Sequence, residues 1–234
     1  MSGSFLAPPL RLRSLALFGG TFDPVHVGHL AAARAARDRF RLDAVHFVVA
    51  SSPPHKTSSP LSPYPHRCSM VALACAGQPR LLPSFAEAGL DSSRGTISYS
   101  VDLVRAYRKR LPRSAHLYFL IGADAFLQIG TWREAETLLD SCDFVVASRP
   151  GFDLEKLRAA LPAGMLAARP IRKTGDHAAS SALRLRRSTV HLMTSIHVDV
   201  SSTGIRRRAA RGLSIHGLVP AAVEDYICKQ ALYR

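Results

Sequence analysis

Short apolar runs, each bounded by turn residues, recur along the chain and predict the strands of a buried sheet. The first two runs are residues 15–18 and 44–50. Runs that are apolar without alternation are typical of parallel strands that are covered on both faces. The same pattern predicts further strands at 80–85, 116–121 and 143–151.

Helix-forming segments alternate with these runs. The segment 30–36 is rich in alanine, and helical patterns recur at 65–74, 103–110 and 217–227. A strand, a helix and a strand in quick succession form a βαβ unit with a right-handed crossover. The sequence therefore predicts an α/β protein: a Rossmann-like, doubly wound parallel sheet with helices on both faces and a C-terminal helical segment.

Length and composition fit one large domain. The chain has 234 residues, of which 47% are hydrophobic and 21% charged, which indicates a globular protein with a sizeable core. We expect a short leader at 1–13, without the pattern of a signal peptide, and a single domain at 14–234. No apolar run approaches the ~20 residues that span a bilayer.

The four cysteines show neither a C-x-x-C pair nor a zinc-like cluster with histidine. Free, mostly buried thiols are typical of a reducing compartment, so we expect a cytoplasmic protein.

The chain is strongly basic, with a formal net charge of +14. Such a surface attracts nucleotides, nucleic acid or acidic membrane, and charge alone does not choose among these and an ordinary solvated surface. Between positions 169 and 187 the chain has six arginines and lysines but only one acidic residue, an aspartate. We interpret 152–191 as a basic, solvated insertion, with a polyanion contact or a subunit interface as the alternative. A homo-oligomer is therefore possible.

A glycine pair and two histidines follow the first apolar run. Gly19 and Gly20 lack side chains, so backbone N–H groups there can approach an anion, and the start of the next helix points its positive end at the same place. His26 and His29 are three residues apart. If the helix has begun by Val25, both imidazoles lie on one face of its first turn.

Two separated motifs carry a family resemblance. The stretch 19–29, with its His-x-Gly-His spacing, resembles the nucleotidylyltransferase superfamily and, within it, the bacterial nicotinate-nucleotide adenylyltransferases. The stretch 201–206 is similar to the superfamily's second signature, Ser-Ser-Thr-x-Ile-Arg. Ser202 or Thr203 can cap a helix there, with Arg206 one turn later. The resemblance implies an ATP site formed by Gly19, Gly20, Thr21, Phe22, His26, His29, Ser202, Thr203 and Arg206.

A second set of residues resembles the family's mononucleotide site. The loop 51–56 follows the second apolar run, and ligands bind at the carboxyl ends of strands in open α/β sheets. Ser-Tyr-Ser stands where the family usually has Ser-Tyr-Thr, and a hydroxyl is kept. An aspartate can accept hydrogen bonds from ribose, and an indole can stack on a pyridine ring. The resemblance implies substrate contacts from His55, Lys56, Ser100, Asp124, Trp132 and Arg149.

These motifs imply adenylyl transfer from ATP to nicotinate mononucleotide, an enzymatic step of NAD biosynthesis, with His26, His29 and Arg206 as catalytic residues. No cluster of acidic residues suggests a dedicated metal site, so Mg²⁺ is expected to arrive mainly with ATP. Nicotinamide mononucleotide or another phosphate acceptor is the nearest alternative. A non-catalytic nucleotide- or nucleic-acid-binding module is a remoter one, although no nucleic-acid-binding signature accompanies the charge and no specific nucleic acid or membrane partner is expected.

Overall fold

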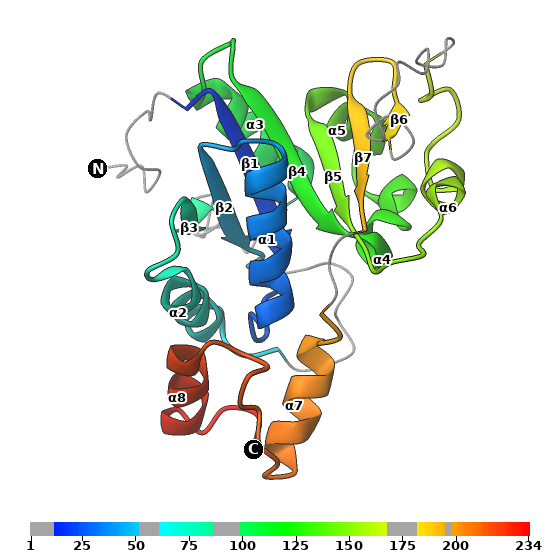
Figure 1. Ribbon diagram of the computed structural model, residues 1–234. Helices are drawn as coiled ribbons and strands as arrows, with labels where there is room; N and C mark the ends of the chain where they lie inside the picture. Colours follow the sequence, from blue (N-terminus) through cyan, green and yellow to red (C-terminus); the bar gives the residue numbers. More distant parts are fainter. Residues whose placement is uncertain (1–11, 52–60, 87–98, 168–181, 195–197) are drawn as a thin grey trace.

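The computed structural model describes residues 12–51, 61–86, 99–167, 182–194 and 198–234 (Figure 1). Within these ranges one sheet has the strand order β3-β2-β1-β4-β5-β7-β6. The strands are β1 (Ser14–Gly20), β2 (Ala44–Val49), β3 (Leu81–Ser84), β4 (His116–Gly122), β5 (Asp143–Ala147), β6 (Ala182–Arg184) and β7 (Thr189–Met193).

Helices connect the strands. They are α1 (Val27–Arg39), α2 (Tyr64–Cys75), α3 (Ser100–Arg110), α4 (Ala123–Phe126), the 3₁₀ helix η2 (Ile129–Thr131), α5 (Ala135–Ser141), α6 (Leu154–Ala159), α7 (Ser202–Ala210) and α8 (Ala221–Lys229). No helix among the described residues is both long enough and apolar enough to cross a membrane.

The order of the strands reverses at β1. This strand pairs in parallel with β2 on one side, where Leu15 faces Ala44, and with β4 on the other, where Leu15 faces Leu117. The chain therefore continues in opposite directions along the sheet on the two sides of β1 and β4, and in open α/β sheets ligands bind at the carboxyl ends of the strands at such a switch point. The turn that carries the two histidines begins at this point.

Alternate residues of β1 face two separate hydrophobic layers. Leu15 and Leu17 pack with buried residues of α3 and α5 on one face of the sheet. Ala16 and Phe18 pack with buried residues of α1 and α2 on the other face. Figure 1 shows α1 and α3 on opposite sides of the strands. The doubly wound fold predicted from the sequence is thus confirmed.

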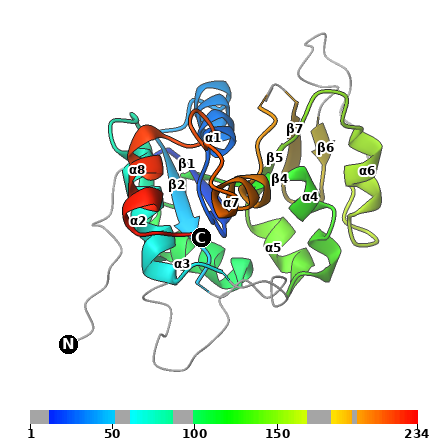
Figure 2. The same cartoon turned by 90° about the horizontal axis from the view of Figure 1, so that it is seen from below.

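The last two helices lie at the carboxyl edge of the sheet, below the strands in Figure 1. The Val27 N–H, at the start of α1, donates a hydrogen bond to the Leu218 carbonyl, 3.0 Å away, from the segment before α8. Figure 2, which looks at this edge, shows α7 beside the start of α1 and α8 beside α2. The C-terminal helical segment therefore lies at the end of the sheet where the histidine turn begins.

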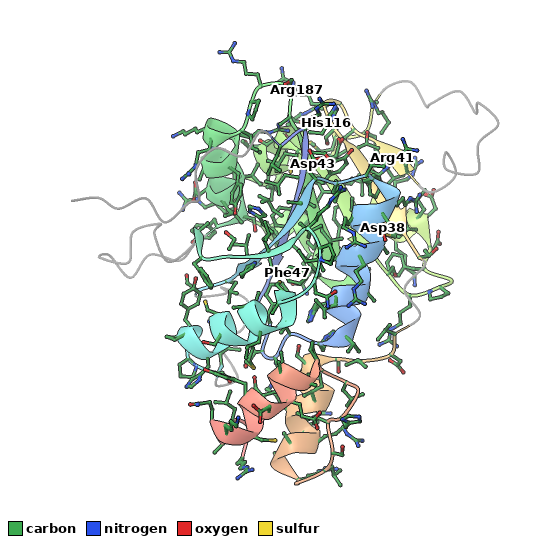
Figure 3. All side chains as sticks on the ribbon, turned by 60° about the vertical axis from the view of Figure 1, so that its left-hand side comes forward. Asp38, Arg41, Asp43, Phe47, His116 and Arg187 are labelled. Atoms are coloured by element: carbon green, nitrogen blue, oxygen red, sulfur yellow. The ribbon has the colours of Figure 1, made fainter. Side chains whose placement is uncertain are left out.

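At the opposite end of the sheet, where β1 and β2 begin, a side chain links two segments of the chain. The Asp43 carboxylate accepts hydrogen bonds from the N–H groups of Arg13 and Ser14, at 2.6 and 3.0 Å. Figure 3 shows Asp43, His116 and Arg187 at this edge, far from α7 and α8, with Phe47 in the interior between the two ends.

The strand predictions at 80–85 and 116–121 are confirmed as β3 and β4, and β5 is shorter than the predicted 143–151 because it ends at Ala147. The sequence pattern missed β6, β7 and α6 within the basic segment 152–191. These elements are short, and β6 pairs antiparallel with β7 at the edge of the sheet, where a long apolar run is not required. Residues 168–181 lie outside the described residues, and both the insertion and the domain bounds remain predictions.

Three of the four free cysteines are buried, and Cys228 is exposed. Burial raises the pKa of Cys75 and of Cys142 to about 12, so both thiols stay protonated and poorly nucleophilic at neutral pH. The expectation of free, mostly buried thiols is confirmed for these residues.

Candidate active site

Neighbouring aromatic rings leave no space for side chains at the two glycines of the first turn. A Cβ atom on Gly19 would lie 3.2 Å from the Phe119 ring, and one on Gly20 would lie 2.8 Å from the Phe22 ring. Phe22 itself is 2% exposed and has a φ of 50°. The backbone of this turn is therefore pressed close to β4 and to its own aromatic residue, and any larger residue would displace it.

The two histidines form a reciprocal cap at the start of α1. The His29 N–H donates to His26 Nδ1 at 3.3 Å, and the His26 N–H donates to His29 Nδ1 at 3.2 Å. Their rings stack with centroids 3.6 Å apart. The helix begins at Val27, with His26 as its N-cap. The condition that the helix has begun by Val25 is therefore not met, and the capping box explains why the two imidazoles still meet.

This cap determines the tautomer of each ring. A nitrogen that accepts a hydrogen bond has no proton, so the neutral ring of each histidine carries its proton on Nε2. Both imidazoles can therefore donate a hydrogen bond from Nε2. Burial lowers the pKa of His26 to about 4, which keeps this ring neutral at physiological pH.

Gly28, one of the two residues between the histidines, must be small. A Cβ atom on Gly28 would lie 3.1 Å from the His26 ring and 3.6 Å from a methyl group of Val198. On the other side of the pair, the His29 ring packs edge-to-face on Phe22, with centroids 5.0 Å apart. The stacked imidazoles are thus held from both sides.

The turn Asp23–Pro24 connects this pair to α7. Arg206 Nη1 donates to the Asp23 carbonyl at 2.7 Å, and Ser202 Oγ donates to the Pro24 carbonyl at 2.9 Å. The cap of α7 is Ser201, whose Oγ accepts from Gly204, and not Ser202 or Thr203 as the sequence suggested. The two phosphate motifs, which the sequence places far apart, therefore meet in one cluster.

Two helix starts without acidic residues point to this cluster. Neither α1 nor α7 has an acidic residue in its first turn. The positive end of each helix dipole is therefore not neutralised by a neighbouring carboxylate, and the first-turn amides are oriented to meet an anion. Because the Ser202 hydroxyl donates to Pro24, its contact with a phosphate would come from the backbone N–H.

Sequence reasoning assigned no role to Arg67, which contacts the backbone of the histidine turn. It is 2% exposed, and its guanidinium donates to the carbonyls of Thr21, Ala50, Ser51 and Ser62 at 2.6 to 3.1 Å. The predicted helix 65–74 contains Arg67, but a buried arginine is rare unless its charge is paired or hydrogen-bonded, so its burial could not be expected from the sequence. Here Arg67 joins the histidine turn to the loop after β2.

A contact between neighbouring residues links the segments that carry Ser100 and Trp132. The Arg133 guanidinium lies 4.6 Å from the Tyr99 ring centroid, which connects the residue after Trp132 with the residue before Ser100. Trp132 packs edge-to-face on Phe119, with centroids 6.3 Å apart, and Phe119 is the ring that touches Gly19. The Phe119 ring therefore lies between the indole and the turn at Gly19.

The other predicted substrate residues are less closely connected. Asp124 is exposed in α4 and follows β4 directly, at the same edge of the sheet. Arg149 follows β5 and forms an exposed ion pair with Asp199, 2.9 Å apart, just before α7. Among the described residues, no hydrogen bond or ion pair joins either side chain to Ser100 or Trp132. His55 and Lys56 lie outside the described residues.

Acidic and sulfur ligands do not converge in the part of the chain that the structure describes. No group of three or more His, Cys, Asp or Glu side chains is arranged there to hold a metal ion.

Buried histidines predict a loss of stability in acid. The pKa of His26 and that of His46 both fall to about 4 through burial, whereas an unfolded histidine titrates near 6.5. Between these values the unfolded chain binds more protons, so the free energy of unfolding decreases as the pH decreases through this window. We expect each residue to contribute a loss of about 2 kcal/mol between pH 7 and pH 5.

Urea unfolding at the two pH values measures this loss, and His46→Asn is the matched variant. Asparagine does not titrate and can keep the contact that His46 Nδ1 makes with the Tyr107 hydroxyl at 3.1 Å. The variant should show a clearly smaller loss in acid than the wild-type chain. An equal loss in both would mean that His46 does not contribute to the pH dependence.

The comparisons with known proteins agree with this geometry. The family model described as cytidylyltransferase-like matches residues 17–208. A protein of Geobacter sulfurreducens named "Probable nicotinate-nucleotide adenylyltransferase" is 41% identical over 220 residues, covering 93% of this chain and 96% of that protein. A protein of the same name from Moorella thermoacetica is 38% identical over 218 residues, covering 93% and 90%.

Solved structures share the fold at low sequence identity. Nicotinic acid mononucleotide adenylyltransferase of Plasmodium falciparum, complexed with NaAD, superposes with a TM-score of 0.69 at 17% identity, covering 94% of this chain and 97% of that one. The same protein complexed with APC gives a TM-score of 0.66 at 16% identity, with the same coverage.

Proposed function

The chain belongs to the cytidylyltransferase-like family and, within it, to the nicotinate-nucleotide adenylyltransferases, and from this premise we propose that it transfers the adenylyl group of ATP to nicotinate mononucleotide. The products are deamido-NAD and pyrophosphate, which makes the reaction a step of NAD biosynthesis. The observation that carries the proposal is the stacked pair His26 and His29 at the start of α1, directly after β1.

The reaction needs charge stabilisation more than a base. A phosphate oxygen of nicotinate mononucleotide forms a bond to the α-phosphorus of ATP, and the bond from that phosphorus to the bridging oxygen breaks, which releases pyrophosphate. The nucleophile is already an anion, so no proton has to be removed from it. The protein lowers the barrier by holding the two groups in line and by placing donors where negative charge develops.

The residues of the cluster provide those donors. The Nε2–H groups of His26 and His29 would donate to phosphate oxygens near the reacting phosphorus. The backbone at Gly19, Gly20 and Thr21 would lie against the nucleotide, and the buried Phe22 would act by packing on His29. Arg206, with the first-turn amides of Ser202 and Thr203, would hold the outer phosphates, which leave as pyrophosphate.

Family members act on a nucleotide together with a divalent metal, and we propose Mg²⁺. The ion would neutralise part of the triphosphate charge when bound. Among the described side chains no acidic group is arranged to replace the phosphate oxygens and water as its ligands. The protein would therefore recognise the metal-bound nucleotide through the histidine pair and Arg206.

We place the acceptor beside the phosphate turn, at Ser100 and Trp132. The contact chain from Gly19 through Phe119 to Trp132 supports this placement, because it puts an indole face within reach of a mononucleotide whose phosphate meets the histidines. Asp124 and Arg149 follow the neighbouring strands at the same edge, and His55 and Lys56 complete the proposed set. The three buried free thiols support a cytoplasmic location.

Pyrophosphate release tests the proposal. The purified protein is mixed with ATP and Mg²⁺, and then with either nicotinate or nicotinamide mononucleotide. We expect kcat/KM to be roughly a hundredfold higher for the nicotinate form, because a charge-assisted hydrogen bond to its carboxylate is worth about 2 to 3 kcal/mol. A reaction without any acceptor gives the background.

Two results would contradict the proposal. Equal rates with the two acceptors would make the enzyme one of dual specificity. No release with either acceptor, from folded protein that still binds ATP, would favour another phosphate acceptor. Salt-sensitive binding of DNA or RNA by the same inactive protein would favour a nucleic-acid-binding module.

A further inference from the structure

A tyrosine from beyond α8 reaches the buried carboxylate of the phosphate turn. The Tyr233 hydroxyl donates to Asp23 Oδ1 at 2.6 Å, and the Ser62 N–H donates to Asp23 Oδ2 at 3.2 Å. Asp23 is 1% exposed. A carboxyl group that is removed from water to this extent needs hydrogen-bond donors. The Tyr233 hydroxyl, 210 positions away in the sequence, therefore stabilises Asp23 in its buried position.

The segment after α8 is shaped to make this contact. Ala231 and Tyr233 have φ values of 50° and 67°, which are unfavourable for residues with a side chain. Leu232 and Tyr233 pack against the hydrophobic layer that contains α2 and α8, and the Tyr233 oxygen lies 3.9 Å from Met70 Sδ. Backbone conformations of this kind persist where surrounding contacts hold them, and here the contacts end at Asp23.

Asp23 is positioned to transmit an effect to the candidate catalytic residues. It lies three residues before His26, and its carbonyl accepts the hydrogen bond from Arg206 Nη1. Its neighbour Pro24 accepts from Ser202. A rotation of this turn would therefore move the cap of α1 and the arginine of α7 together.

We propose that Tyr233 is a positioning residue for adenylyl transfer, which acts by holding Asp23 so that the stacked histidines and Arg206 face the same triphosphate. This inference rests on the proposed function. Burial raises the pKa of Tyr233, so its hydroxyl remains a protonated donor across the physiological range. Tyr233 therefore affects the binding and reaction of a nucleoside triphosphate, although its hydroxyl does not touch this ligand.

The test compares two tyrosines from the same part of the chain. Tyr233→Phe removes only the oxygen that reaches Asp23. Tyr226→Phe is the matched control, because its hydroxyl contacts His66 Nδ1 at 2.9 Å between α8 and α2 and does not reach the turn. The quantities to measure are kcat and KM for each substrate, the melting temperature, and amide exchange of residues 19–29.

We expect Tyr233→Phe to fold and to lower kcat/KM for ATP about tenfold, the effect of losing one hydrogen bond that holds the catalytic groups in position. The KM for the mononucleotide should stay within about twofold, and the amides of 19–29 should exchange faster. Tyr226→Phe should leave all of these values near those of the wild-type chain. In combination with Asp23→Asn, Tyr233→Phe should add little, because both changes weaken the same contact.

Three results would overturn the inference. The first is Tyr233→Phe kinetics within twofold of the wild type. The second is an equal loss in Tyr226→Phe, and the third is failure of Tyr233→Phe to fold, since both would assign the hydroxyl to stability. If the wild-type chain itself does not turn over, the proposed function fails, and amide exchange with binding of a non-hydrolysable ATP analogue still tests the role of Tyr233.

Discussion

We expect His29→Asn to fold as the wild-type chain does and to turn over about 100 to 1,000 times more slowly. The asparagine side-chain oxygen can take the place of Nδ1 and accept from the His26 N–H, so the reciprocal cap of α1 is kept. The variant lacks the Nε2–H group, and one donor directed at developing charge is worth a factor of this size. Steady-state rates and thermal melting measure the two effects separately.

Two further substitutions of His29 separate its role in capping α1 from its proposed contact with the phosphate. His29→Gln places an amide N–H near the position of Nε2 but loses the acceptor at Nδ1. It should recover part of the activity and melt at a lower temperature. His29→Ala loses both contacts, and near-normal turnover in a folded His29→Ala variant would remove this histidine from the mechanism.

We expect Arg67→Met to lower the free energy of unfolding by about 4 kcal/mol. Methionine has a similar length but cannot donate to the carbonyls that Arg67 holds, and each buried carbonyl left without a donor costs about 1 to 3 kcal/mol, partly relieved by water. Urea unfolding at pH 7 gives the value.

Arg34→Met is the matched control for this prediction. Arg34 is exposed, and its guanidinium donates only to the Gln78 side chain among the contacts described, at 2.7 and 3.1 Å. Its replacement should change the free energy of unfolding by no more than about 0.5 kcal/mol. A loss of similar size in both variants would mean that the buried position of Arg67 has no special importance.

The elements that the sequence predicted well are those whose pattern is set by local burial. Residues 15–18, 44–50 and 116–121 form strands covered on both faces, so nearly every position in them is apolar, with His46 and His116 as the exceptions, and the run is visible without the structure. The strand β7 was missed because it follows a basic stretch. Its place in the sheet depends on pairing with β5, a contact between distant segments.

The candidate site divides in the same way. The turn 19–29 and the stretch 201–206 are recognisable because their chemistry needs particular residues at fixed local spacings. The exact start of α1 and the Ser201 cap were not recognisable, because a helix end is decided by which neighbouring side chain reaches the free amides. Several residue types at adjacent positions were able to do so.

By itself the sequence determined the doubly wound fold and the two motifs at 19–29 and 201–206, because apolar periodicity and short-range spacing are properties of neighbouring residues. Only the tertiary structure decided that Arg206 meets Asp23 and that Tyr233 supports the same aspartate. It also decided that Arg67 is buried beneath the turn. These are hydrogen bonds between groups separated by many positions, and their partners are selected by the way the layers pack, which no local pattern records.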